Sequence, residues 1–112
     1  MSAEAVRSPF FVQTGGYIVG RSRWFGTHGT WPFGQLRIYD DRLVLKAFFR
    51  AYEFPRESID SLAIAVGPLS VGLRIEHSVS EYPPIIVFWS FNIAELQEHL
   101  ETADYRVSHA NT

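Results

Sequence analysis

The sequence predicts a mainly β domain: a small barrel or sandwich of bent antiparallel strands, closed at one end by a single C-terminal α-helix. Short runs that alternate apolar and polar residues are separated by Gly, Pro and Asp, which is typical of strands joined by tight turns. Two such runs form a clear hairpin at 35–48, and the apolar period becomes helical after Asn92. Because no helix alternates with strands, an α/β fold is disfavoured.

The first third of the chain is expected to contain one strand between two turns. Residues 15–16 are Gly-Gly and residues 26–29 contain two further glycines, so both segments predict turns. Between them, 17–25 has the alternation of a strand. Pro32 limits the following segment, 30–34, to an edge strand or a strand start, because proline cannot donate a hydrogen bond to a neighbouring strand.

The hairpin is the clearest element of the sequence. Its strands are expected at 35–39 and 42–48, and Asp40–Asp41 forms the two-residue loop between them. Leucine and isoleucine alternate with polar residues in the first of these strands, so one face packs on a core and the other faces water. A short strand at 51–54 follows, with Phe49–Arg50 as its turn.

The rest of the chain contains further strands and then a helix. Strands are expected at 59–66, 71–77 and 85–89. Asn92 with Glu95 three residues later resembles a capping box, and apolar residues at helical spacing then predict a helix over 93–103. A short extended stretch at 105–107 ends the ordered part.

The length and composition bound the class of protein. With 112 residues, a single domain over 10–107 is expected, between flexible ends at 1–9 and 108–112. The absence of cysteine excludes disulfides, thiolate zinc sites and a cysteine nucleophile. A net charge of −2 argues against nucleic acid as a partner, since that partner calls for a basic surface.

Neither a membrane span nor an export signal is expected. The most apolar run, Pro83–Phe91, has the length of a strand and falls well short of the roughly 18 to 20 apolar residues that cross a bilayer. The N-terminus lacks the basic start and apolar stretch of a secretory signal. A cytoplasmic location is therefore expected by default.

Three segments together resemble a known fold family. They are the hairpin GQLRIYDDRLVL at 34–45, the step YEFPRESI at 52–59, and the passage from strand to helix at 86–96. Their order is similar to the pleckstrin-homology-like (PH/GRAM-like) superfold, particularly its bacterial branch, over residues 15–107. The resemblance implies a partly open, partly orthogonal barrel of about seven antiparallel strands capped by the helix. Family members bind phosphoinositides or peptides, and some bacterial ones assemble into ring-like homo-oligomers.

The resemblance also implies a weak ligand site. Head-group binders of the family place basic residues around the first strand, its loop and the second strand, and the matching positions here are Arg21, Arg23 and Arg37, with His28 nearby. Arginine binds phosphate through paired donors. The alternative is that Arg21 and Arg23 are simply solvated strand residues, which the negative net charge favours.

The aromatic residues divide into two groups. The aromatics Phe48, Phe54, Phe88 and Trp89, with Leu96, are expected to fill the barrel and seat the helix. A second group, Trp24, Phe25, Trp31 and Phe33, lies in a segment rich in turns and is harder to bury. This second group either lines the mouth of the barrel or forms an exposed surface for a partner chain.

Catalytic and metal sites are not expected. The four histidines are scattered, and Glu95 with His99, one helical turn apart, lacks a third metal ligand. A solvent-facing ion pair between Glu95 and His99 on the helix is favoured instead. The pair Asp40–Asp41 is explained by turn chemistry. We therefore expect no enzyme, cofactor or metal. The leading hypothesis is a binding or assembly module that acts through protein contacts, including self-association, and the alternative is an anionic ligand such as a phosphoinositide head group.

Overall fold

The computed structural model describes residues 9–21, 26–67 and 70–109, in which eight β-strands, one α-helix and one short 3-10 helix follow one another. The elements are β1 (Phe11–Gly20), β2 (Gly26–Ile38), β3 (Arg42–Ala47), β4 (Arg50–Pro55), η2 (Arg56–Ser58), β5 (Ile59–Val66), β6 (Val71–His77), β7 (Ile85–Ser90), α1 (Ile93–Thr102) and β8 (Ser108–His109). None of the helices in these ranges has the length and apolar character that crossing a membrane requires.

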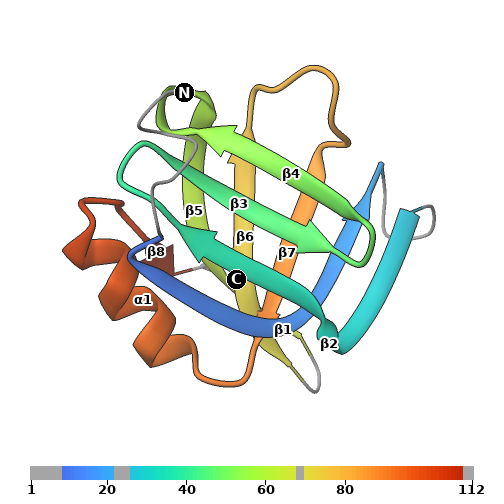
Figure 1. The fold of residues 1–112 in the computed structure, drawn as a ribbon, viewed down its shortest axis with the longest axis horizontal. Helices are drawn as coiled ribbons and strands as arrows, with labels where there is room; N and C mark the ends of the chain where they lie inside the picture. The colour runs from blue at the N-terminus through green and yellow to red at the C-terminus, as the bar shows by residue number, and fades with distance from the viewer. Residues whose placement is uncertain (1–8, 22–25, 68–69, 110–112) are drawn as a thin grey trace.

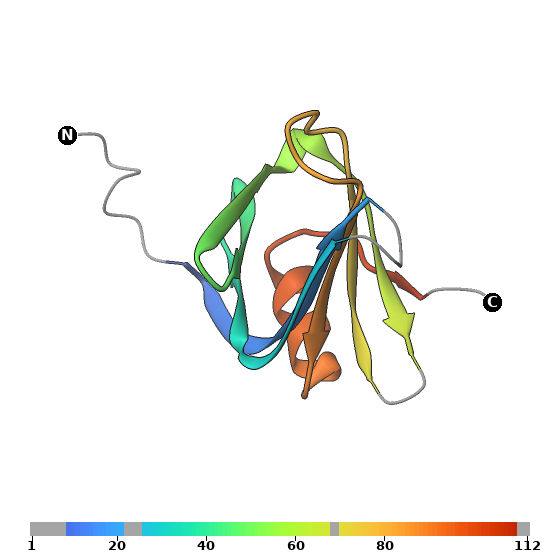
Figure 2. The same cartoon turned by 90° about the vertical axis from the view of Figure 1, so that its right-hand side faces the viewer.

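The strands form one curled sheet. Their order is β4-β3-β2-β1-β7-β6-β5-β8, and every neighbouring pair is antiparallel except β5 with β8. In Figure 1, β1 to β4 cross in front of β5 to β7, and Figure 2 shows α1 at one end of the space between these two halves. This arrangement confirms the predicted class, a mainly β half-barrel of antiparallel strands with one C-terminal helix.

The core lies between the two halves of the sheet and the helix. Successive side chains of a strand point to opposite faces, so Leu36 and Ile38 point inward while Arg37 between them faces outward. The predicted interior residues Phe54 and Phe88 are fully buried, and Leu96 and Leu100 seat the helix on this core. Their burial explains why a helix this short is stable.

Strand β1 differs from its prediction at both ends. It begins at Phe11 and ends at Gly20, so the expected turn at Gly15–Gly16 lies inside the strand. Here β1 acquires a second neighbour, β7, and its register with β2 shifts between Gly15 and Tyr17. A Cβ at Gly15 would lie 2.0 Å from the carbonyl oxygen of Trp89. The glycine is therefore required by the close approach of two strands, not by a turn.

Strand β2 begins at Gly26 and pairs with β1 over 26–29, so the predicted turn there is wrong, and a large bulge lies in the predicted edge strand at 30–34. The register passes from Gly34 opposite Gly15 to Gly29 opposite Tyr17, so residues 30–33 face a single residue of β1. Pairing with β3 also starts only at Gly34. Pro32 therefore lies where β2 pairs with neither neighbouring strand, so its lack of a backbone N–H costs no inter-strand hydrogen bond. For this reason β2 can contain a proline while lying inside the sheet.

The predicted hairpin is present, with one change at its far end. Ile38 pairs with Leu43, and the N–H of Tyr39 donates to the carbonyl of Arg42 across the Asp40–Asp41 loop at 2.9 Å. However, β3 ends at Ala47 and the turn to β4 is Phe48–Phe49, one residue earlier than predicted.

The C-terminal helix begins as predicted and ends one residue early. The Asn92 Oδ1 accepts a hydrogen bond from the Glu95 N–H at 3.2 Å, whereas the Asn92 N–H donates to Ser90 Oγ at 3.0 Å. Only one of the two hydrogen bonds of a capping box is therefore present, and we call this cap a half-box. Ser90 of β7, not Glu95, accepts the Asn92 N–H. Beyond the helix, Ser108 and His109 pair with β5, past the expected domain boundary at 107.

Candidate interaction surface

Four large aromatic side chains are exposed on the β2 bulge and the β3–β4 turn. The exposed fractions are 56% for Trp31, 50% for Phe33, 51% for Phe48 and 87% for Phe49. The rings of Phe33 and Phe48 meet edge to face at 5.2 Å between centroids, and those of Phe48 and Phe49 lie 4.0 Å apart. The N–H of Phe48 also donates to the Phe33 carbonyl at 2.9 Å. The rings of Phe33, Phe48 and Phe49 therefore form one continuous set across bulge and turn, and Trp31 is exposed on the same bulge.

The turn holds Phe48 in a conformation that favours glycine. Its φ is 59°, and it is the first of the two turn residues between Ala47 and Arg50. Tight hairpins with a positive φ at this position normally have Gly there, and a non-glycine residue in this left-handed region costs about 1 to 2 kcal/mol. Folding alone does not call for two phenylalanines here, so the strain points to a function of the turn.

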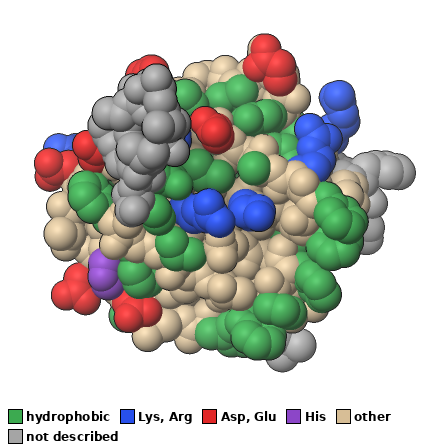
Figure 3. Space-filling view, in the orientation of Figure 1, with side chains coloured by type: hydrophobic (Ala, Val, Ile, Leu, Met, Phe, Trp, Pro, Cys, Tyr) green, Lys and Arg blue, Asp and Glu red, His purple; other side chains and the backbone are tan. Residues whose placement is uncertain are grey.

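A groove continues this surface toward the start of α1. Its volume is about 550 Å³, and it runs between Trp31 of the bulge, Trp89 of β7 and Phe91, which is 81% exposed. A neighbouring hollow of about 470 Å³ shares Thr30 and Trp89 with the groove and is also lined by Phe33. In Figure 3, hydrophobic side chains gather along the right-hand and lower margins of the face in front of β1 to β4. We call the residues Trp31, Phe33, Phe48, Phe49 and Phe91 the aromatic surface.

Trp89 forms the floor of this groove, so its predicted place in the barrel interior is wrong. It pairs with Gly72 of β6, and Phe88 beside it takes the inward position. A Cβ at Gly72 would lie 2.8 Å from the indole ring, and one at Gly67 would lie 3.5 Å from it. The half-buried indole therefore lies on the outer face against Gly72, whose missing side chain leaves room for the ring, and at ordinary contact distance from Gly67.

The structure places part of the predicted interaction surface and adds to it. Trp31 and Phe33 are exposed as one of the two interpretations requires, while Trp24 and Phe25 lie outside the described residues. Phe48 is half exposed, so its predicted place in the barrel interior is wrong. Its turn position, outside the buried face of β3, is the physical reason.

Two residues of the aromatic surface, Phe49 and Phe91, were not predicted from the sequence. A signal for Phe48 was present in the strand phase: Leu43, Leu45 and Ala47 alternate inward, so the next residue belongs to the outer face.

The basic residues of the expected ligand site do not gather. Arg21 directly follows β1 and His28 pairs with Ile18, so both belong to the β1–β2 end of the sheet. Arg37 instead pairs with Val12, which lies six residues before Ile18 in β1, a separation of about 20 Å in an extended strand. Arg37 Nε donates to Gln35 Oε1 at 2.7 Å, as a solvated strand residue does. Arg23 lies outside the described residues.

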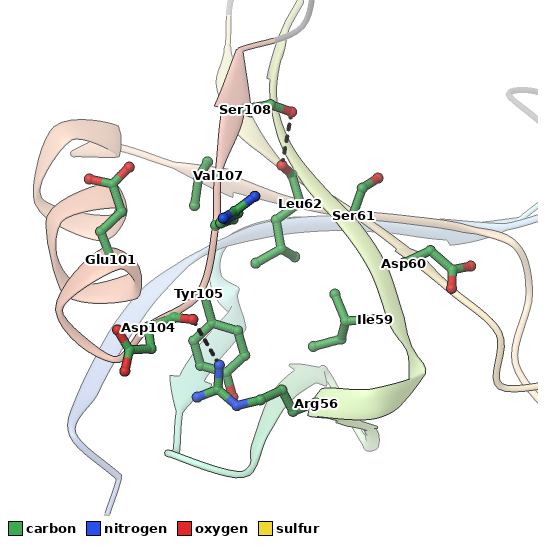
Figure 4. Close-up of a pocket in the computed structure, with 11 residues that line it drawn as sticks. Arg56, Ile59, Asp60, Ser61, Leu62, Glu101, Asp104, Tyr105, Val107 and Ser108 are labelled. Carbon is green, nitrogen blue, oxygen red and sulfur yellow. Dashed lines mark hydrogen bonds between the residues drawn. The ribbon is translucent and has the colours of Figure 1, made fainter.

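A second cleft, of about 700 Å³, lies between β5 and the segment that follows α1 (Figure 4). Arg56 dominates it. Its guanidinium donates to the carbonyl oxygens of Asp40, Ala103 and Asp104, and it lies 3.8 Å from the centre of the Tyr105 ring. The donors of this arginine are thus used within the chain, where they attach the end of the helix to η2 and to the β2–β3 loop.

Tyr105 is the one described residue with a clearly displaced pKa. Burial disfavours the phenolate and raises the pKa of Tyr105 to about 12, although the positive charge of Arg56 acts in the opposite direction. The hydroxyl donates to the Tyr39 carbonyl at 2.8 Å. This tyrosine is therefore neutral over the whole physiological range and serves as a structural donor.

No set of three His, Asp or Glu side chains that could hold a metal is found among the described residues. Within the described part of the chain, the side chains of Glu95 and His99 form neither a metal site nor the expected ion pair. His99 Nδ1 lies 2.9 Å from the Glu95 carbonyl oxygen, and its ring stacks on Phe11 at 3.9 Å between centroids. His99 therefore packs α1 against β1.

Compared with known proteins, the chain matches no family model and has no significant similarity to a curated protein sequence.

Proposed function

We propose that the chain is a non-enzymatic protein-interaction module of the pleckstrin-homology-like type, as in its bacterial branch, that acts in the cytoplasm. Its aromatic surface binds another polypeptide, and self-association is the simplest form of that activity. The partner is a protein and not a nucleic acid, because the net charge is −2. The observation that carries the proposal is the joint exposure of Trp31, Phe33, Phe48 and Phe49 on adjoining elements.

The topology supports the fold part of the proposal. The resemblance implies about seven antiparallel strands capped by a C-terminal helix, and a curled antiparallel sheet followed by one helix supports that part of the proposal. Fold by itself does not define a function, so the functional part depends on the surface.

Two features of the surface favour a protein partner. Aromatic residues are enriched in the centres of protein interfaces, where they supply much of the binding energy. A single exposed ring would need no explanation, but contiguous exposed rings mark an interaction site. The low net charge of −2 also leaves little electrostatic repulsion between two copies.

Sedimentation equilibrium over a concentration series that extends to hundreds of micromolar tests the proposal. The wild-type mass should rise above the 12.8 kDa of one chain, and Phe49→Ser should shift this rise to higher concentration. Phe10→Ser is the matched control, because Phe10 is 62% exposed but lies beside the end of α1. A wild-type mass of one chain at every concentration contradicts self-association, and an equal effect of the two variants contradicts the assigned surface.

A further inference from the structure

The aromatic surface contains both a projection and a hollow. The projection is the β3–β4 turn, where Phe49 is the most exposed large apolar residue of the described chain. The hollow is the groove between Trp31 and Phe91. Phe33 lies between them, because its ring contacts Phe48 and also lines the hollow next to the groove.

The groove suits an uncharged aromatic occupant. Among the described residues, those that line it carry no charge; besides the three aromatic rings they are glycine, serine, threonine, valine and isoleucine. Its volume of about 550 Å³ well exceeds the roughly 150 Å³ at which an apolar cavity in another protein accepts benzene. Phenyl rings therefore fit it, and a charged ligand would find no partner in its lining.

We infer that this occupant is the Phe48–Phe49 turn of a second copy, and that two copies dock reciprocally, each turn in the groove of the other. The inference rests on the proposed self-association and specifies its geometry. It also explains why the turn holds a strained phenylalanine where glycine is favoured, since glycine would remove part of the projection.

The area of the surface decides between reciprocal and one-sided docking. With about 200 Å² per aromatic residue, the exposed parts of the five residues amount to about 650 Å² per copy. Reciprocal docking buries both surfaces, about 1,300 Å² in total, which lies within the range of roughly 1,200 to 2,000 Å² for specific interfaces. A single turn in a single groove buries only about half of this area. A closed two-fold dimer is therefore favoured over an open chain of copies.

Disulfide cross-linking tests this geometry, because the wild-type chain contains no cysteine. Arg50→Cys places a thiol beside the turn and Thr30→Cys places one beside the groove, and both variants keep every aromatic residue. In the reciprocal dimer the turn of one copy meets the groove of the other. An oxidised equimolar mixture should therefore give the mixed disulfide in excess of the half share that random pairing produces.

The alternatives give different results. If two copies stack turn against turn, Arg50→Cys alone should cross-link as well as the mixture, which would overturn the inference. Phe10→Cys, mixed with either variant, is the control and should give no excess. A dimer by sedimentation without the mixed disulfide rejects the docking geometry and leaves self-association standing. A wild-type chain that stays monomeric rejects both.

Discussion

The guanidinium of Arg56 stacks on the ring of Tyr105, 3.8 Å from its centre, and so ties η2 to the segment after the C-terminal helix. The same side chain donates to the carbonyls of Asp40 in the β2–β3 loop and of Ala103 at the helix end. Three segments far apart in sequence thus meet at one arginine. The helix is held at the end of the half-barrel by this contact and by its two buried leucines.

Replacing Arg56 should weaken this attachment strongly. Arg56→Ala leaves carbonyls at the end of α1 without their donors, and we expect the free energy of unfolding to fall by about 2 to 4 kcal/mol. Arg56→Lys should recover only part of this loss, because an ammonium group lacks the planar fork of donors. Urea denaturation measures both variants. A loss of less than about 1 kcal/mol for Arg56→Ala would show that the packing of the leucines alone holds the helix.

The buried Tyr105 predicts a stability loss at high pH. Its pKa is raised to about 12 in the folded chain by burial, against about 10 when unfolded. Its stabilising contribution is thus fully present below about pH 10 and decreases by about 1.4 kcal/mol per pH unit as the pH rises from 10 to 12. The difference between wild type and Tyr105→Phe in urea denaturation isolates this slope. Equal slopes for the two proteins over that range would contradict the assignment.

The helix cap gives a smaller and separable effect. Asn92→Ala removes the acceptor of the Glu95 N–H, so the free energy of unfolding should fall by about 1 kcal/mol. Asn92→Ser should retain most of the stability, since serine is also a good N-cap. Glu95→Gln should change little, because Ser90 already accepts the Asn92 N–H. If the glutamine variant is as destabilised as the alanine variant, the half-box interpretation is wrong.

Phe48 should show opposite effects on folding and on association. Phe48→Gly removes the cost of holding a non-glycine residue in a left-handed conformation, about 1 to 2 kcal/mol. The greater loss of backbone entropy of glycine on folding offsets about 0.5 to 1 kcal/mol of this gain. The monomer, measured at low concentration, should therefore be as stable as wild type or up to about 1.5 kcal/mol more stable. Its self-association should nevertheless be weaker. A clearly destabilised monomer would mean that the ring serves the fold itself.

Much of the fold could be predicted because local and global signals agree. The hairpin around Asp40–Asp41 has both the alternation of its strands and the chemistry of its turn, and α1 has both a cap and an apolar stripe. The glycines at 15–16 and the bulge at 30–33 could not be placed in this way. Their conformation is fixed by strands from distant parts of the sequence, above all by β7 against β1.

The candidate surface could be predicted only in part for a related reason. Exposure of Trp31 and Phe33 follows from a segment with turn residues and a proline, which the sequence displays. The position of Phe48 depends instead on where β3 ends, and an error of one residue at a strand end changes an aromatic side chain from core to surface. The position of Trp89 depends on Gly72 beneath it, which belongs to another strand, β6.

The concentration dependence of the backbone amide signals in heteronuclear NMR spectra tests the central claim most directly. On dilution of the wild-type chain, the account predicts shifts grouped at residues 30–34, 47–50 and 89–91, with the signals around Phe10 and along the outer side of α1 unchanged. Signals that stay constant over the whole series, or shifts grouped around Phe10 and α1, would contradict self-association through the aromatic surface.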